Sequence, residues 1–134
     1  MVSVAAHDPL YNGVSFKLVP ANKEPTIQDL LRHTSGLTYG ELTKNTLVKD
    51  AYNQAGIYQP SIDFDARTPS SAEMVERLGK APLAQQPGTV WEYSLSVDVQ
   101  GRIIEAVTGQ RLGDFLQARL FQPLKMKDTG FAVS

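Results

Sequence analysis

The sequence has no cysteine, and this absence removes several kinds of chemistry at once. Disulfides, a thiol nucleophile and cysteine-ligated zinc or iron–sulfur sites are all excluded. The two histidines, His7 and His33, stand far apart in the chain without the spacing of metal ligands, so we predict no metal site and no cofactor. A chain without cysteine is compatible with any redox compartment.

An excess of one charge and a long apolar run are missing as well. The 13 Lys and Arg residues nearly balance the 14 Asp and Glu residues, which leaves a net charge of −1. Proteins that bind nucleic acid usually have a basic excess, so we predict no nucleic-acid partner. No stretch approaches the ~18 apolar residues of a membrane span, and we predict no span. The length of 134 residues suits a single domain over residues 1–134.

The apolar residues recur at helical spacing over most of the chain. Thr26 and Asp29 form a capping-box signal before a helix over residues 27–33, and Ser70 and Glu73 form a second one before a helix over 71–78. Similar patterns predict helices over 42–55, 95–107 and 112–121, whereas residues 14–18 alternate like a short strand. We therefore predict a mainly α fold with long loops and little β structure.

The same patterns predict which side chains form the core. They are the apolar residues on the inner faces of these helices, together with one tryptophan and one leucine outside them. The expected core is Leu30, Leu31, Leu37, Met74, Val75, Leu78, Trp91, Val99, Ile103, Ile104, Val107, Phe115, Leu116, Leu120 and Phe121.

Two stretches contain side chains that could perform catalysis. In the first, His33 and Ser35 follow the helix that begins after Thr26, and they could form a nucleophile–base pair. Turn and capping roles are far more common for such residues, and the chain has no Gly-x-Ser-x-Gly elbow. The sequence therefore favours a structural role for Ser35 over a nucleophilic one.

In the second stretch, a turn at Pro87 and Gly88 leads to Tyr93 just before a helix. A tyrosine at such a junction can place its phenol in a cleft, where it can transfer protons. Alternatively, Tyr93 only packs, while Ser94 or Ser96 caps the helix. On spacing alone, packing is the more common role.

Several motifs in these stretches resemble one family. Residues 26–37, TIQDLLRHTSGL, are similar to a segment of the serine β-lactamase-like hydrolases, which include class C β-lactamases, penicillin-binding DD-peptidases and β-lactamase-fold esterases. Residues 86–94, 98–105, 107–109 and 123–131 match the same family in order and spacing. The resemblance spans about residues 8–131, and the Tyr-Ser form at 93–94 is closest to the esterase branch.

The resemblance implies a fold and a set of site residues. The chain would be the helical region between the family's Ser-x-x-Lys and Lys-Thr-Gly motifs, and Tyr93 would be the general base. Ser94 and Leu95 would contribute to substrate binding. Leu95 stands where the family's Tyr-x-Asn motif has asparagine, and this departure argues against potent β-lactam hydrolysis.

The sequence contains neither Ser-x-x-Lys nor Lys-Thr-Gly. We therefore expect a fragment of a serine hydrolase that acts on a small-molecule ester or β-lactam through an acyl-enzyme, and we expect this chain to be inactive alone. A second hypothesis is a non-catalytic helical module that binds a partner or forms a homo-oligomer through exposed apolar surface. A third is that another chain supplies Ser-x-x-Lys.

Overall fold

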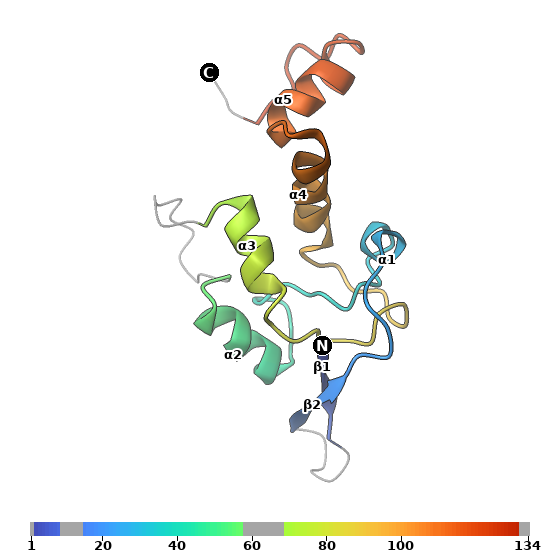
Figure 1. The fold of residues 1–134 in the computed structure, drawn as a ribbon, viewed down its shortest axis with the longest axis vertical. Helices are drawn as coiled ribbons and strands as arrows, with labels where there is room; N and C mark the ends of the chain where they lie inside the picture. Colours follow the sequence, from blue (N-terminus) through green and yellow to red (C-terminus); the bar gives the residue numbers. More distant parts are fainter. Residues whose placement is uncertain (1, 9–14, 58–68, 132–134) are drawn as a thin grey trace. The chain divides into compact units, whose positions relative to one another are not determined.

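The computed structural model describes residues 2–8, 15–57 and 69–131, which form two compact units, Met1–Gln100 and Gly101–Ser134 (Figure 1). The elements follow one another along the chain as strands β1 and β2, five α-helices and a final π-helical turn. Their bounds are β1 Ser3–His7, β2 Phe16–Pro20, α1 Ile27–Leu31, α2 Thr46–Gln54, α3 Ser71–Leu78, α4 Ser96–Thr108, α5 Leu112–Leu116 and η1 Gln117–Phe121.

The prediction of a mainly α fold with little β structure is wrong. The described residues are 40% helical and 10% strand, and the strands form an antiparallel two-stranded sheet. Strand β1 pairs with the nearby β2 along one edge, but its partner on the other edge is remote in sequence. Its Ala5 N–H donates to the Leu83 carbonyl at 2.8 Å, and the Leu83 N–H donates to the Ser3 carbonyl at 2.9 Å. A short apolar run becomes a strand when other backbone segments satisfy its polar groups.

Both predicted capping boxes are confirmed. At α1 the Asp29 N–H donates to the Thr26 hydroxyl at 3.1 Å, and the Thr26 N–H donates back to the Asp29 carboxylate at 3.0 Å. Ser70 and Glu73 make the same pair of bonds at α3. Helix α2 begins later than predicted, because the Asn45 side chain accepts the Val48 N–H and caps it there.

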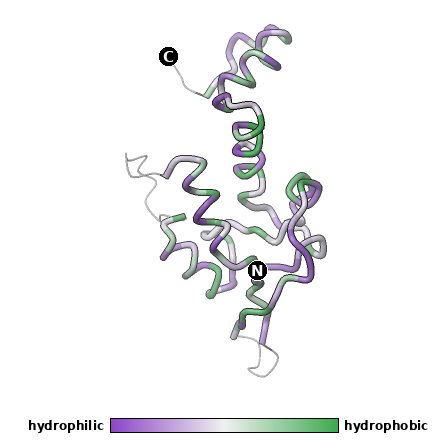
Figure 2. The backbone as a smooth tube through the Cα atoms, in the orientation of Figure 1, coloured by the Kyte–Doolittle hydropathy of each residue, from purple (hydrophilic) through white to green (hydrophobic). Residues whose placement is uncertain are grey.

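The core of the first unit is built around the sheet and α2. Val48 and Tyr52, one turn apart on α2, are completely buried, as is nearly all of Val4 on β1. Figure 2 shows α2 and α3 with both hydrophilic and hydrophobic segments along their length. Buried apolar side chains of the described residues are Val4, Ala5, Leu30, Leu37, Val48, Tyr52, Leu78, Leu83, Ala84 and Phe121.

Only part of the predicted core is correct. Leu30, Leu37, Leu78 and Phe121 are buried as expected, and several other expected members are half-buried. The wrong members are Leu31, Trp91, Val107 and Leu120, which are exposed. Helical spacing finds an apolar face, but it does not establish whether anything covers that face.

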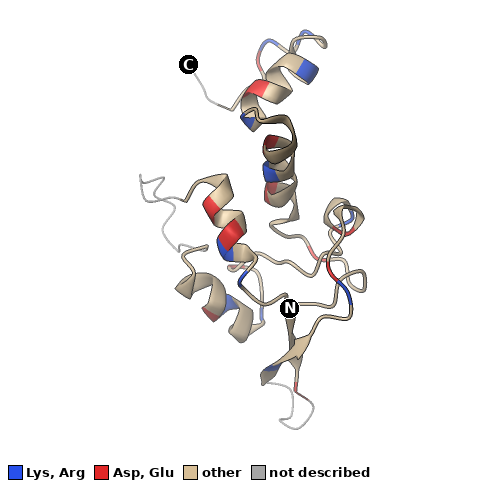
Figure 3. Cartoon of the chain, in the orientation of Figure 1, with Lys and Arg blue, Asp and Glu red and all other residues tan. Residues whose placement is uncertain are grey.

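Charges of both signs are interspersed over the described part of the chain (Figure 3). In the first unit Lys80 and Glu76 pair across one turn at 2.8 Å. In the second unit Arg102 pairs with Glu105 at 3.7 Å. No helix among the described residues has both the length and the apolar character that crossing a membrane requires.

Candidate active site

Two loops of the first unit, residues 33–38 and 84–96, run against each other and form the frame of the site. The Gly88 N–H donates to the Thr34 carbonyl at 2.7 Å, and the Glu92 N–H donates to the His33 carbonyl at 2.9 Å. These bonds join the end of α1 to the segment before α4 although 54 or more residues separate them in sequence. The family-like segments that contain His33 and Tyr93 are therefore neighbours in space.

Gly36 makes this close approach possible. Its φ is +85°, and a Cβ built there would lie 2.3 Å from the Gln85 carbonyl oxygen. The Gly36 carbonyl accepts the Ala84 N–H at 2.8 Å, which holds the two loops together at this point. Only a residue without a side chain fits both the backbone conformation and the space.

Tyr93 lies between two other rings. Its ring centroid is 5.3 Å from that of His33 and 5.2 Å from that of Tyr39, with interplanar angles of 45° and 51°. The His33 ring also meets Trp91 edge-on at 6.0 Å. Tyr93 nevertheless remains 54% exposed. The ring is thus packed on its sides while solvent and small molecules can reach the residue.

Tyr39 differs from Tyr93 in its surroundings. Burial, followed by the nearby Asp98 carboxylate and by Tyr93, raises the pKa of Tyr39 to about 12. A phenol with that pKa holds its proton throughout the neutral range. Tyr39 is therefore poorly suited to accept a proton.

Ser94 points into the interior rather than toward solvent. Its side chain is fully buried, and its Oγ lies 2.8 Å from Ser96 Oγ and 3.3 Å from Nδ1 of His33. Leu95, the next residue, is half-buried. Their roles in substrate binding stay predictions. The geometry found here connects Ser94 to His33.

Ser35 and His33 do not form a catalytic pair. Ser35 is fully buried, its Oγ lies 2.8 Å from Ser96 Oγ, and it accepts the Leu37 N–H at 3.3 Å. The nitrogen of His33 meets Ser94 instead. A buried hydroxyl whose neighbours are structural cannot reach a substrate, so the structural role that the sequence favoured agrees with this geometry.

Beneath the His33 loop, Asp29 joins several groups. Its carboxylate binds the Lys23 ammonium at 2.8 Å and accepts the hydroxyls of Thr26 at 2.7 Å and Thr34 at 3.1 Å. The Lys23 ammonium, followed by the Thr26 N–H and hydroxyl, holds the pKa of Asp29 well below its ordinary value. Asp29 is therefore a carboxylate at neutral pH, and it ties the end of α1 to the loop that follows.

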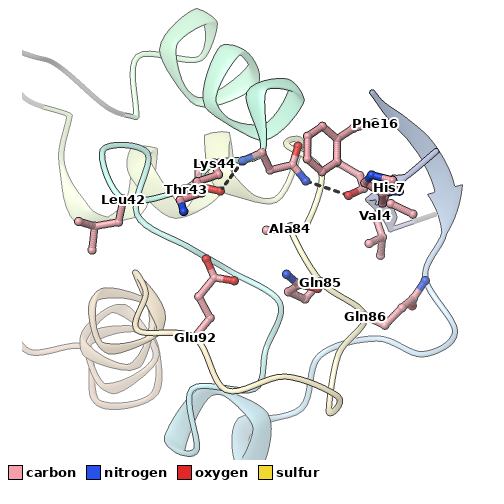
Figure 4. Close-up of a pocket in the computed structure, with 13 residues that line it drawn as sticks. Val4, His7, Phe16, Leu42, Thr43, Lys44, Ala84, Gln85, Gln86 and Glu92 are labelled. Carbon is pink, nitrogen blue, oxygen red and sulfur yellow. Dashed lines mark hydrogen bonds between the residues drawn. The ribbon is translucent and has the colours of Figure 1, made fainter. Parts of the chain in front are cut away.

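The first unit also contains an open cavity of about 500 Å³ (Figure 4). Residues of both strands and of the loops 42–45 and 84–86 line it, and Glu92 reaches into it from the segment that precedes Tyr93. The Glu92 carboxylate accepts the hydroxyl of the buried Thr38 at 2.6 Å. Tyr93 itself lies outside the lining of this cavity.

Sequence reasoning missed the contacts that surround Tyr93. Tyr39 and His33 both touch its ring, yet they lie more than 50 residues away in the chain. The sequence signal for the His33 contact is the family-like stretch over residues 26–37, which ends two residues before Tyr39. Among residues 2–8, 15–57 and 69–131, no group of three or more His, Cys, Asp or Glu side chains could hold a metal ion.

A model of the family described as Beta-lactamase matches residues 4–134. The chain belongs to the β-lactamase family. Esterase EstB of Burkholderia gladioli is 43% identical over 106 residues, which are 79% of this chain and 26% of EstB. The lovastatin esterase of Penicillium rubens is 34% identical over 112 residues, which are 84% of this chain and 25% of that enzyme.

A solved structure is similar to this chain as well. EstCE1, described as a hydrolase with promiscuous acyltransferase activity, superposes with a TM-score of 0.65 at 28% identity, over 81% of this chain and 27% of EstCE1. The chain spans about a quarter of the length of the curated relatives it matches. The family resemblance predicted from the His-Thr-Ser-Gly and Tyr-Ser motifs is thus confirmed.

Proposed function

We propose that this chain forms the tyrosine-bearing part of a serine esterase, with Tyr93 as the general base. The observation that carries the proposal is the position of Tyr93, whose ring is packed between His33 and Tyr39 while 54% of the residue remains exposed. A general base needs a fixed position and access to the group whose proton it takes. The names of EstB and of the lovastatin esterase support ester hydrolysis as the reaction.

In the proposed reaction Tyr93, present as the phenolate, takes the proton from a serine hydroxyl as that oxygen attacks the ester carbonyl. Tyr93 then returns the proton to the departing alcohol, and water releases the acyl group in a second, equivalent step. The 134 residues contain no Ser-x-x-Lys, so the serine and lysine would come from sequence outside them. Alone, the chain is expected to hydrolyse no ester.

The substrate is proposed to be a small carboxylic ester rather than a β-lactam. Leu95 occupies the position of the family's Tyr-x-Asn asparagine, so this position offers no side-chain amide to bind a substrate amide. An ester lacks that amide N–H. The half-buried Leu95 side chain provides apolar surface instead.

A chimaera tests the assignment of Tyr93. The matching 106 residues of EstB are replaced by those of this chain, and hydrolysis of p-nitrophenyl butyrate is measured. Tyr93→Phe should lower kcat by about 10²–10⁴, the usual contribution of a general base. The matched comparison is Tyr39→Phe, which keeps the ring beside Tyr93 but removes a hydroxyl that interacts with it, so kcat should fall by much less than in Tyr93→Phe.

Two results would contradict the proposal. One is a Tyr93→Phe chimaera that hydrolyses the ester as fast as its parent chimaera. The other is clear turnover by the isolated 134 residues that is lost in Tyr93→Phe, because this would show that another residue of the chain acts as the nucleophile.

A second candidate function is self-association, and exposed apolar side chains favour it. In the first unit Leu31, Leu42 and Trp91 are each more than 60% exposed. Side chains of this size that face water favour contacts with a second apolar surface when they gather into a patch. Light scattering of the isolated chain should then show a dimer or larger species, and a monomer at high concentration would argue against this function.

A further inference from the structure

Four polar side chains form a continuous series of hydrogen bonds that ends at the ring beside Tyr93. Ser35 Oγ lies 2.8 Å from Ser96 Oγ, and Ser96 Oγ lies 2.8 Å from Ser94 Oγ. The last contact joins Ser94 Oγ to Nδ1 of His33 at 3.3 Å. The three serines, called the buried serine chain below, are fully buried, so bulk water is not an alternative partner for their hydroxyls.

The number of protons decides the direction of these hydrogen bonds. The three contacts need one proton each, and the three serine hydroxyls supply three. If Nδ1 of His33 has no proton, Ser94 donates to it and each serine behind donates to the next. Every hydroxyl proton is then used, and every contact is a hydrogen bond.

A proton on Nδ1 of His33 would add a fourth proton to these three contacts. It would donate to Ser94, and four protons would compete for three contacts. One buried serine hydroxyl would then have no acceptor among the described residues, which is unfavourable. Ser35, at the far end of the series, cannot donate its proton elsewhere, because its remaining neighbour is the Leu37 N–H, which is itself a donor. The buried serine chain therefore favours the neutral imidazole that carries its proton on Nε2.

The backbone of His33 is fixed as well. Its φ is 55°, a left-handed conformation that few residues with side chains adopt, and its carbonyl accepts the Glu92 N–H at 2.9 Å. The ring is thus held through its backbone and through Nδ1. The centroid of the ring lies 5.3 Å from that of Tyr93.

We propose that His33 is a positioning residue for Tyr93, and that the buried serine chain locks its imidazole in the Nε2–H tautomer. A locked imidazole presents one face to Tyr93 and cannot rotate away, which keeps the phenol in one place. The inference rests on the proposed function only in the assignment of Tyr93 as the base. The tautomer and the ring contact can be measured without any turnover.

The test is nitrogen-15 NMR of the isolated chain at about pH 8.5, where a free imidazole is neutral. His7 is the second histidine and is exposed, so it provides a reference in the same spectrum. Nδ1 of His33 should give the shift of an acceptor nitrogen and Nε2 that of a protonated one, with a tautomer ratio of at least about ten to one. Cross-peaks should join the His33 and Tyr93 rings.

Two matched variants complete the test. Ser94→Ala removes the hydroxyl that donates to Nδ1 of His33. It should bring the His33 tautomer ratio toward that of His7 and weaken the cross-peaks to Tyr93. Ser35→Ala removes a buried hydroxyl from the far end, where Ser94 can still donate to His33, and should leave the tautomer unchanged. A wild-type His33 that carries its proton on Nδ1, or that matches His7, overturns the proposal even if neither variant folds.

The failure of this inference is distinguishable from that of the proposed function. If Tyr93→Phe leaves the EstB chimaera fully active while the tautomer is locked, then Tyr93 is not the base and the buried serine chain still holds its neighbour. If the tautomer is mixed while Tyr93→Phe abolishes turnover, then the base is correctly assigned and His33 does not position it.

Discussion

Replacing Gly36 by alanine tests whether the two loops of the site depend on close backbone contact. The new Cβ would lie 2.3 Å from the Gln85 carbonyl oxygen, so the backbone of one loop would have to move. A left-handed φ costs a residue with a side chain about 1–2 kcal/mol, and relieving the overlap costs about 1–3 kcal/mol more. Losing the bond from the Ala84 N–H adds about 0.5–1.5 kcal/mol.

Gly36→Ala should therefore lower the free energy of unfolding by roughly 2.5–6.5 kcal/mol, a large share of the total for a domain of this size. The matched control is Gly88→Ala in the same unit. Its φ of +83° is nearly identical, but the new Cβ would meet the flexible end of Lys23 at 3.0 Å and the Asp29 carboxylate at 3.4 Å, and no backbone atom closer than these. This variant should lose about 1–2 kcal/mol.

Urea unfolding followed by far-UV circular dichroism measures both variants, and the midpoints are compared at equal slopes. Equal midpoints for Gly36→Ala and Gly88→Ala would show that the close contact with Gln85 contributes nothing, and the structural reasoning for this site would be refuted.

The capping box of α1 yields two further predictions. Asp29→Asn should lower the unfolding temperature at pH 7, and this effect should shrink as the pH falls from about 4 to about 2. A carboxyl whose folded pKa is lowered contributes its full stability above its unfolded pKa of about 4 and loses it as the pH falls through the folded value. A difference that does not shrink on acidification would contradict this. Thr26→Ala should cost about 1 kcal/mol in urea unfolding at pH 7, and no change would mean that its hydroxyl does not cap the helix.

The motifs of this chain predict its family better than its fold class. The His-Thr-Ser-Gly and Tyr-Ser stretches resemble the serine β-lactamase-like hydrolases in order and spacing, and the family is confirmed. The mainly α prediction failed at the N-terminal segment. Strand β1 has no strong pattern of its own, since adjacent Val4 and Ala5 are both buried and do not alternate between faces.

At the site, too, the motifs predict which residues take part but not how their side chains are arranged. Tyr93 was predicted from the family motif, and the structure places it among rings that the sequence did not connect to it. Ser94 was predicted beside the substrate, and its hydroxyl lies in the interior against His33. A motif indicates which residues belong to a site, but it does not show which way each side chain points.

The sequence by itself determined the local structure of this chain, above all the starts of two helices. The capping boxes at Thr26 and Ser70 involve partners three residues away, so the intervening chain alone brings them together. Only the tertiary structure decided the contacts of His33 with Ser94 and Tyr93, about 60 residues away. Such contacts depend on how loops are held by remote hydrogen bonds and by a glycine that lets two backbones meet, and no short stretch of sequence contains that information.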